Sequence, residues 1–190
     1  MIYIIRHGET DLNRRRVLQG RSDHPLNETG LAQARAAAES LEEISFQQVY
    51  TSPLLRARQT ARIIAPGVRP VVDRRLIEMD YGPYEGMDLH APAPEVIEFF
   101  RDFVHNPAPP GMEPLEKVVE RAGAFLEDLK GSCMGDILLS THAIAMKGLL
   151  EYLTPGSQGG YWSRNIGNCE VYVTEYRDGA YSVPEPFVKG

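Results

Sequence analysis

Apolar positions in the first half of the chain fall into short runs typical of buried strands and wider stripes typical of helices. Residues 2–5 form a continuous apolar run rich in β-branched side chains, which predicts a strand buried on both faces. Residues 47–51 and 69–73 predict two more strands. Asn27, between the first and second of these strands, is suited to cap a helix. Ser52-Pro53, between the second and third, is suited to open another.

The second half of the chain repeats this alternation after an irregular stretch. Residues 81–110 are rich in proline and glycine and contain one predicted helix, at 96–104. Helical spacing then runs from Leu115 to Leu129. A strand follows at 136–141, and then a helix that Pro155-Gly156 ends. Residues 170–183 predict a hairpin around Asp178-Gly179.

Strands that alternate with helices predict an α/β fold, here a three-layer sandwich with helices on both faces of a mostly parallel mixed sheet. We expect a single domain over residues 1–190, with the 81–110 excursion lying over the active-site end. The terminal hairpin requires at least one antiparallel strand. Ligands bind beyond the carboxyl ends of such strands. His7 and His142 directly follow two of the strands, so we expect them to meet.

Composition narrows the class of protein. The chain has 190 residues and a formal net charge of −6, which argues against a nucleic-acid or anionic-membrane partner. It lacks the pattern of a signal peptide and any apolar stretch of membrane-spanning length, so we expect a cytoplasmic protein. Its two cysteines, Cys133 and Cys169, have no metal-ligand or redox spacing and are expected to be reduced, partly buried thiols.

Histidine and arginine gather where the predicted elements converge. Packing alone seldom ends a buried strand with Arg6-His7. Taken singly, His7 or His142 is compatible with a solvated turn, and Arg56 with a surface helix. Their joint placement at strand ends and in a first helical turn favours a shared site.

The fuller pattern, Arg6-His7-Gly8-Glu9-Thr10 with Asn13, resembles the RHGxTxxN signature of the histidine phosphatase superfamily, also called the phosphoglycerate-mutase-like family. The resemblance covers about the first 150 residues, with the motifs in order. The other matching segments are Gln19-Gly20 with Asp23, Pro25-Leu26 and Gly30; Tyr50-Thr51-Ser52-Pro53-Leu54 with Arg56-Ala57 and Thr60-Ala61; Leu76, Glu78, Gly82 and Tyr84-Glu85-Gly86; and Ser140-Thr141-His142.

The resemblance implies a phosphatase that acts on a small phosphorylated metabolite without a cofactor or a metal. His7 would be the nucleophile and would form a phosphohistidine. Arg6 and Arg56 would hold the phosphoryl oxygens, and His142 would donate a hydrogen bond. Glu78 would protonate the leaving group. The substrate-binding residues implied are Arg6, Asn13, Gln19, Gly20, Arg56, His142 and Ala143.

The sequence also departs from the family pattern. Ala143 replaces the glycine that usually follows the second histidine, and its methyl group could narrow the pocket. Tyr84 stands where tryptophan is common. The family's GES segment reads Met112-Glu113-Pro114 here, so no site role is assigned to it. The basic run 14–16 (Arg14, Arg15, Arg16) is either a solvated face or an attractor of anionic substrate groups.

Other functions remain open. A phosphoglycerate mutase would use the same nucleophile, although mutases of the family are usually longer. A non-catalytic phospholigand-binding module would keep the anion site without turnover. A metal hydrolase using His7, His142 and Glu78 is disfavoured, because the sequence lacks HxxxH or HxH spacing and two arginines would repel the ion. The particular metabolite and the oligomeric state stay open. We expect residues 81–110 to shape substrate choice.

Overall fold

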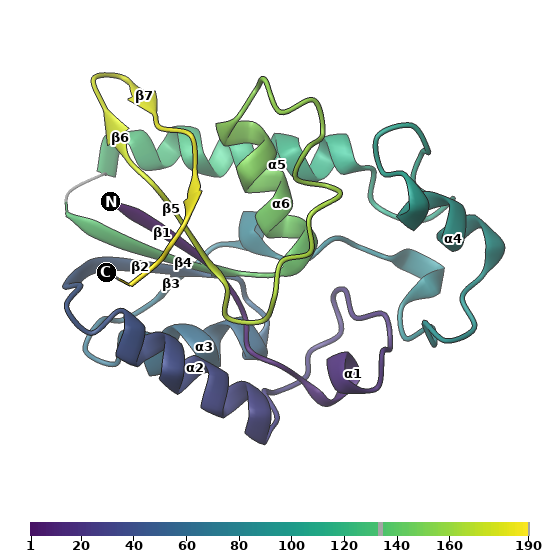
Figure 1. The fold of residues 1–190 in the computed structure, drawn as a ribbon, viewed down its shortest axis with the longest axis horizontal. Helices are drawn as coiled ribbons and strands as arrows, with labels where there is room; N and C mark the ends of the chain where they lie inside the picture. Colours follow the sequence, from purple (N-terminus) through teal and green to yellow (C-terminus); the bar gives the residue numbers. More distant parts are fainter. Residues whose placement is uncertain (133–134, 190) are drawn as a thin grey trace.

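A computed structural model describes residues 1–132 and 135–189 of the chain, and Figure 1 shows its layers. In these residues, six strands form one mixed sheet in the order β3-β2-β4-β1-β5-β8. The strands of this sheet are β1 (Ile2–Arg6), β2 (Phe46–Thr51), β3 (Val71–Val72), β4 (Asp136–Thr141), β5 (Val171–Thr174) and β8 (Glu185–Pro186).

The four strands β3, β2, β4 and β1 run parallel, whereas β5 and β8 run antiparallel to their neighbours. The central strands are buried on both faces, as their continuous apolar runs predict. The register pairs Arg6 of β1 with Thr141 of β4. His7 and His142 therefore follow paired positions on adjacent parallel strands, and the predicted meeting of the two histidines is confirmed.

Helices cover both faces of the sheet, which confirms the three-layer sandwich (Figure 1). α2 and α3 pack on one face, and α5 and α6 on the other. The helices are α1 (Asp11–Arg14), α2 (Glu28–Ser40), α3 (Leu55–Ile64), α4 (Pro94–Arg101), α5 (Leu115–Leu129) and α6 (Ala143–Leu153). Single 3₁₀ turns are η1 (Arg74–Leu76), η2 (Gly82–Tyr84) and η3 (Lys130–Ser132).

Several predicted boundaries are wrong for identifiable reasons. α3 begins at Leu55 rather than at Ser52-Pro53, because Asp23 Oδ1 accepts from the Leu55 amide at 2.6 Å while Ser52 Oγ lies 2.7 Å from His142 Nε2. The 69–73 strand shrinks to Val71–Val72, at the sheet edge. The 96–104 helix runs from Pro94 to Arg101, because Asp102 is extended.

The C-terminal hairpin also differs from its prediction. Asp178 and Gly179 have positive φ angles of 53° and 85°, as the predicted turn requires. They join β6 (Tyr176–Arg177) to β7 (Ala180–Tyr181), a separate two-stranded ribbon. The chain then returns to the main sheet as β8, which the alternation pattern did not predict.

The irregular excursion lies past the carboxyl ends of β1 and β4, where Figure 1 draws α4 and α1. Its backbone is tied to the loop that follows α1. The Leu18 amide donates to Met87 O at 2.8 Å, and the Gly86 amide returns to Leu18 O at 2.9 Å. A third apolar cluster joins Val96 and Phe99 of the excursion to Met79 and other residues outside it. The excursion is therefore attached to the segment that leaves β1.

Two expectations from composition concern the cysteines and the membrane. Cys169 is half-buried and free, and burial raises the pKa of its thiol to about 12. Cys133 lies outside the described residues. Within residues 1–132 and 135–189, no helix has both the length and the apolar character needed to cross a bilayer.

Candidate active site

His7 lies at the end of β1 with its ring buried and held at both nitrogens. Nδ1 lies 2.6 Å from Gly8 O, which can only accept a hydrogen bond, so Nδ1 carries the proton. Arg56 Nε, which can only donate, lies 3.2 Å from His7 Nε2. Nε2 therefore presents a lone pair. The backbone is also fixed, because Asn168 Nδ2 donates to His7 O at 2.9 Å.

Arg56 is fully buried in the first turn of α3 and is held by the loop after α1. Its Nη2 donates to Gly20 O at 2.7 Å, and its Nη1 donates to Ser22 O at 2.8 Å. With the bond to His7, three of its five N–H groups are used, which leaves two for a ligand. Arg56 thus connects the loop after α1 and the helix α3 to the His7 ring.

His142 follows β4 and is the N-cap residue of α6. Its ring centroid lies 5.1 Å from that of His7, with the planes 62° apart. His142 Nε2 is 2.7 Å from Ser52 Oγ, which also accepts from the Leu54 amide at 3.3 Å. Ser52 can therefore direct its own proton at Nε2, which is consistent with a protonated Nδ1 on His142.

Glu78 follows the turn η1 and is 4% exposed. Its Oε1 accepts from the amides of Met79 at 2.8 Å and Ala145 at 3.0 Å, and its Oε2 lies 3.3 Å from the Ile144 amide. The carboxyl group thus caps the N-terminus of α6, the helix that begins immediately after His142. The two side chains are held at the same end of one helix.

Some polar atoms of this region are buried without a partner. In the described parts of the chain, the buried side-chain nitrogens and oxygens that lack a hydrogen bond are Arg6 Nε, Gln19 Nε2 and His142 Nδ1. Such atoms are rare in native proteins and call for an explanation. All three belong to residues that the sequence assigned to the site. Two of them are obligate donors, which suits an anionic ligand.

Other sequence-predicted residues have supporting contacts. Asn13 Oδ1 accepts from the Thr10 amide at 3.1 Å, which closes a capping box at the start of α1. Gly20 is buried, and its carbonyl oxygen accepts a hydrogen bond from Arg56. Ala143, the first residue of α6, is partly exposed. The basic run 14–16 is exposed, and Arg14 pairs with Asp11.

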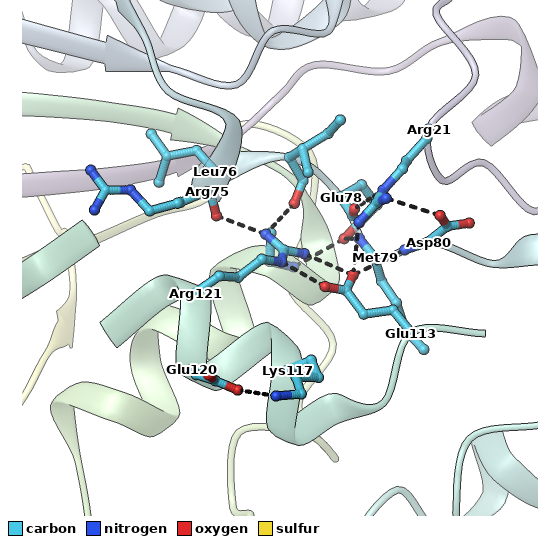
Figure 2. Close-up of polar contacts among 12 residues, drawn as sticks. Arg21, Arg75, Leu76, Glu78, Met79, Asp80, Glu113, Lys117, Glu120 and Arg121 are labelled. Carbon is cyan, nitrogen blue, oxygen red and sulfur yellow. Dashed lines mark hydrogen bonds and ion pairs between the residues drawn. The ribbon is translucent and has the colours of Figure 1, made fainter. Parts of the chain in front are cut away.

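Sequence reasoning missed several residues that build the site. Glu85 accepts from the amides of Gly20 at 2.9 Å and Arg21 at 3.1 Å and from Ser22 Oγ at 2.6 Å, so it shapes the loop that holds Arg56. Glu113, which was given no role, bonds to the segment carrying Glu78 (Figure 2). Glu85 falls within a matched family segment, which was the available signal, whereas Glu113 falls where the chain departs from the family's GES segment.

Burial and nearby positive charge set the protonation of the site. Burial, together with the charges of Arg56 and Arg6, lowers the pKa of His7 well below its ordinary value of 6.5. Burial and Arg56 lower the pKa of His142 in the same way. Burial lowers the pKa of Arg56 to about 10, which leaves the guanidinium charged near pH 7. The site therefore combines neutral imidazoles with cationic guanidinium groups.

This arrangement can bind an oxyanion and present it with a nucleophilic nitrogen. Among the described residues, no three His, Cys, Asp or Glu side chains gather in a group that could hold a metal ion. Positive charge at the site comes from Arg6 and Arg56. These features define a site suited to phosphoryl chemistry.

The comparison with protein families agrees with this geometry. The sequence profile of the histidine phosphatase superfamily (branch 1) matches residues 2–186, and the chain belongs to that family. The superfamily has phosphohydrolase activity, so the chain is an enzyme of phosphate-ester chemistry.

Individual relatives fall on both the phosphatase and the mutase side of the family. The chain is 33% identical over 171 residues to "Uncharacterized phosphatase PhoE" of Bacillus subtilis (strain 168), covering 88% of this chain and 84% of the relative. It is 36% identical over 183 residues to "Probable phosphoglycerate mutase GpmB" of Photorhabdus laumondii subsp. laumondii, covering 93% and 85%. A solved mycobacterial glucosyl-3-phosphoglycerate phosphatase in complex with VO3 is 26% identical, with a TM-score of 0.85 and 96% of each chain covered.

Proposed function

We propose that this protein hydrolyses a small phosphate monoester through a phosphohistidine formed at Nε2 of His7. The observation that carries the proposal is the tautomer of His7. Its proton is held on Nδ1 by Gly8 O, and its Nε2 lone pair lies among cationic side chains. Imidazole in this state is a nucleophile at neutral pH, because its low pKa keeps it unprotonated.

Phosphate binding would use the donors that the protein leaves unsatisfied. Arg6 Nε, Gln19 Nε2 and His142 Nδ1 are buried and lack partners in the described residues. The two remaining N–H groups of Arg56 add further donors. Fixed donors of this kind stabilise the charge on the equatorial oxygens as the phosphoryl group transfers. We assign Asn13 to the same role through its amide nitrogen, since its oxygen is taken by Thr10.

In the first step, His7 Nε2 attacks phosphorus, a P–N bond forms and the bond to the leaving oxygen breaks. We assign the proton for that oxygen to Glu78, whose Oε2 has a single 3.3 Å backbone contact and can carry it.

In the second step, a water molecule attacks the phosphohistidine. Glu78, now a carboxylate, takes one proton of that water, while the P–N bond breaks and its electron pair returns to Nε2. Inorganic phosphate leaves, and His7 is restored as the neutral Nδ1–H tautomer. One residue thus acts first as an acid and then as a base.

Phosphoglycerate mutase is the second candidate, favoured by the 36% identity to the relative named GpmB. A mutase would pass the phosphoryl group from His7 back to the substrate instead of to water. It would convert 3-phosphoglycerate with bisphosphoglycerate present and release no phosphate. Because the same residues would serve both reactions, the two activities are separated by measuring phosphate release against conversion of 3-phosphoglycerate.

We further propose that the reaction needs no metal ion, because Arg6 and Arg56 supply the positive charge that a metal would otherwise provide. The net charge of −6 supports an enzyme of small metabolites rather than a partner of nucleic acids or membranes. We propose a cytoplasmic location because the sequence lacks the pattern of a signal peptide. Turnover that is lost in chelator and restored by a divalent ion would contradict the first statement.

The deciding experiment measures phosphate release from a panel of phosphorylated metabolites in chelator, with His7→Ala in parallel. We expect release by the wild type and less than a few per cent of it by the variant, with an unchanged circular dichroism spectrum. Substantial release by His7→Ala would point to another nucleophile. Tight phosphate binding without turnover by the wild type would instead favour a non-catalytic module.

A further inference from the structure

The backbone before Glu78 is held by one arginine of α5. Arg121 Nη1 donates to Arg75 O at 2.7 Å and to Ile77 O at 2.6 Å (Figure 2). Ile77 immediately precedes Glu78 in the chain. Arg121 therefore fixes the approach of the segment that delivers the Glu78 carboxyl group to α6.

The backbone after Glu78 is held by Glu113. The Glu113 carboxylate receives Arg121 Nε at 2.8 Å and Arg121 Nη2 at 3.2 Å, and it also accepts from the Asp80 amide at 3.1 Å. The Glu113 amide in turn donates to Asp80 O at 2.8 Å. Glu113 and Arg121 thus hold the backbone on both sides of Glu78 by hydrogen bonds, as Figure 2 shows.

Arg21 joins this cluster to the loop that holds Arg56. It lies 3.3 Å from the Glu113 carboxylate and 2.9 Å from that of Asp80. Its neighbours in the sequence are Gly20 and Ser22, whose carbonyls accept from Arg56. The carboxylate of Glu113 is therefore a junction between the two segments that carry Glu78 and hold Arg56.

The Glu113–Arg121 pair is largely buried, with side-chain exposures of 12% and 16%. Buried ion pairs add little net stability, because desolvation offsets their attraction. Such pairs require a specific geometry, since the guanidinium and the carboxylate must stay aligned to form two parallel hydrogen bonds. The simpler explanation of the Glu113–Arg121 pair is that it only fastens α5 to the segment that carries Glu78. It predicts a loss of stability without any selective effect on the chemistry.

We propose that Glu113 is a positioning residue for Glu78: it fixes the Glu78 carboxyl group where it can protonate the leaving oxygen. This inference rests on the proposed phosphatase function. Its chemical signature is a selective loss with poor leaving groups. An alkyl phosphate needs the proton from Glu78, whereas p-nitrophenolate is stable enough to leave without it.

The kinetic test compares Glu113→Gln with Glu120→Gln, using an alkyl phosphate and p-nitrophenyl phosphate. Glu120 is the matched control, because it is a glutamate beside Arg121 on α5 in an exposed pair with Lys117 at 2.6 Å (Figure 2). We expect Glu113→Gln to lower kcat by about tenfold for the alkyl ester, less than the 10²-fold or greater loss of the acid itself, and by much less for the aryl ester. Glu120→Gln should match the wild type. Equal slowing of both esters by Glu113→Gln would overturn the proposal.

A second readout does not require turnover. The Ala145 amide donates to Glu78 Oε1, so its hydrogen exchange reports whether that carboxyl group is in place. Exchange at Ala145 should accelerate in Glu113→Gln and stay unchanged in Glu120→Gln. Unaltered protection in both variants would contradict a positioning role. If Glu113→Gln does not fold, Glu113→Asp, which keeps the charge, provides the same two measurements.

The two readouts also separate this inference from the proposed function. Absence of phosphate release by the wild type would count against the phosphatase, and Ala145 exchange would then decide the role of Glu113 alone. Normal wild-type turnover with equal slowing of both esters would leave the phosphatase standing and remove the positioning role.

Discussion

Arg56 Nε lies 3.2 Å from His7 Nε2, so the arginine donates to the atom that we propose as the nucleophile. The contact has two consequences. It selects the tautomer with the lone pair on Nε2, and it places a positive charge where the phosphoryl group would arrive. The same guanidinium group is anchored by Gly20 O and Ser22 O, so its orientation is set before any ligand binds.

Arg56→Lys tests whether the fork, and not only the charge, is needed. A lysine ammonium cannot reach His7, Gly20 and Ser22 together, because it lacks the planar fork of donors. We expect kcat/KM for p-nitrophenyl phosphate to fall about 10²- to 10³-fold, as for a lost oxyanion donor. Steady-state kinetics on folded protein checks this.

Arg58→Lys is the control for that substitution. Arg58 lies on the same helix but lines a separate pocket with Arg62 and Arg69. We expect its activity to remain close to that of the wild type. Near-normal activity in Arg56→Lys would show that charge alone suffices at this position.

Gly20→Ala tests the packing behind Arg56. A Cβ at Gly20 would lie 2.6 Å from Glu85 Oε2 and 2.7 Å from Met79 O, closer than real Cβ contacts allow. We expect a loss of about 1–3 kcal/mol in unfolding free energy, as for overpacking, and reduced activity as Gly20 O moves from Arg56. Gly67→Ala, with no heavy atom within 4 Å, is the control. Similar unfolding midpoints for both variants would refute the close contact.

Glu78→Gln tests the proposed acid directly. Glutamine keeps the shape but cannot transfer the proton, so turnover of an alkyl phosphate should fall about 10²-fold or more, the range for a lost acid–base group. Turnover of p-nitrophenyl phosphate should fall less, because its leaving group needs little help. Kinetics across leaving groups of rising pKa measures this dependence. A uniform decrease across the series would remove the acid role from Glu78.

The meeting of His7 and His142 could be predicted from sequence because each directly follows an apolar run, and the carboxyl ends of parallel strands lie at one edge of the sheet. Two apolar runs predict parallel strands, and the histidines follow both of them. The register then places Arg6 opposite Thr141, so the rings come within 5.1 Å between centroids. The fold class could be predicted for the same reason, since alternation of elements determines the layers.

The supporting residues could not be predicted, because their contacts join distant segments. Ser52 looked like a helix cap by local rules, yet its hydroxyl contacts His142, and Asp23 from another loop caps α3. Glu113 lies 35 positions after Glu78 in the sequence and meets its segment only through the folded excursion. β8 is two residues long and lacks any periodic signal.

The pH dependence of stability gives the last prediction. His7 and His142 have pKa values well below their ordinary 6.5, mainly because both rings are buried. The unfolded chain therefore binds protons that the native protein does not, and stability must fall as the pH drops below about 6.5. Each histidine contributes up to about 1.4 kcal/mol per pH unit below that point.

Urea unfolding between pH 7.5 and 5.5 measures this slope. Because the folded-state pKa values are lowered, the contribution of the neutral rings is complete above 6.5 and is lost progressively toward the lower folded-state values. His7→Gln removes one of the two titrating rings, so its slope in this window should be smaller than that of the wild type by about one proton. Identical slopes for the two proteins would mean that His7 binds protons equally in the native and unfolded states, so that folding does not lower its pKa.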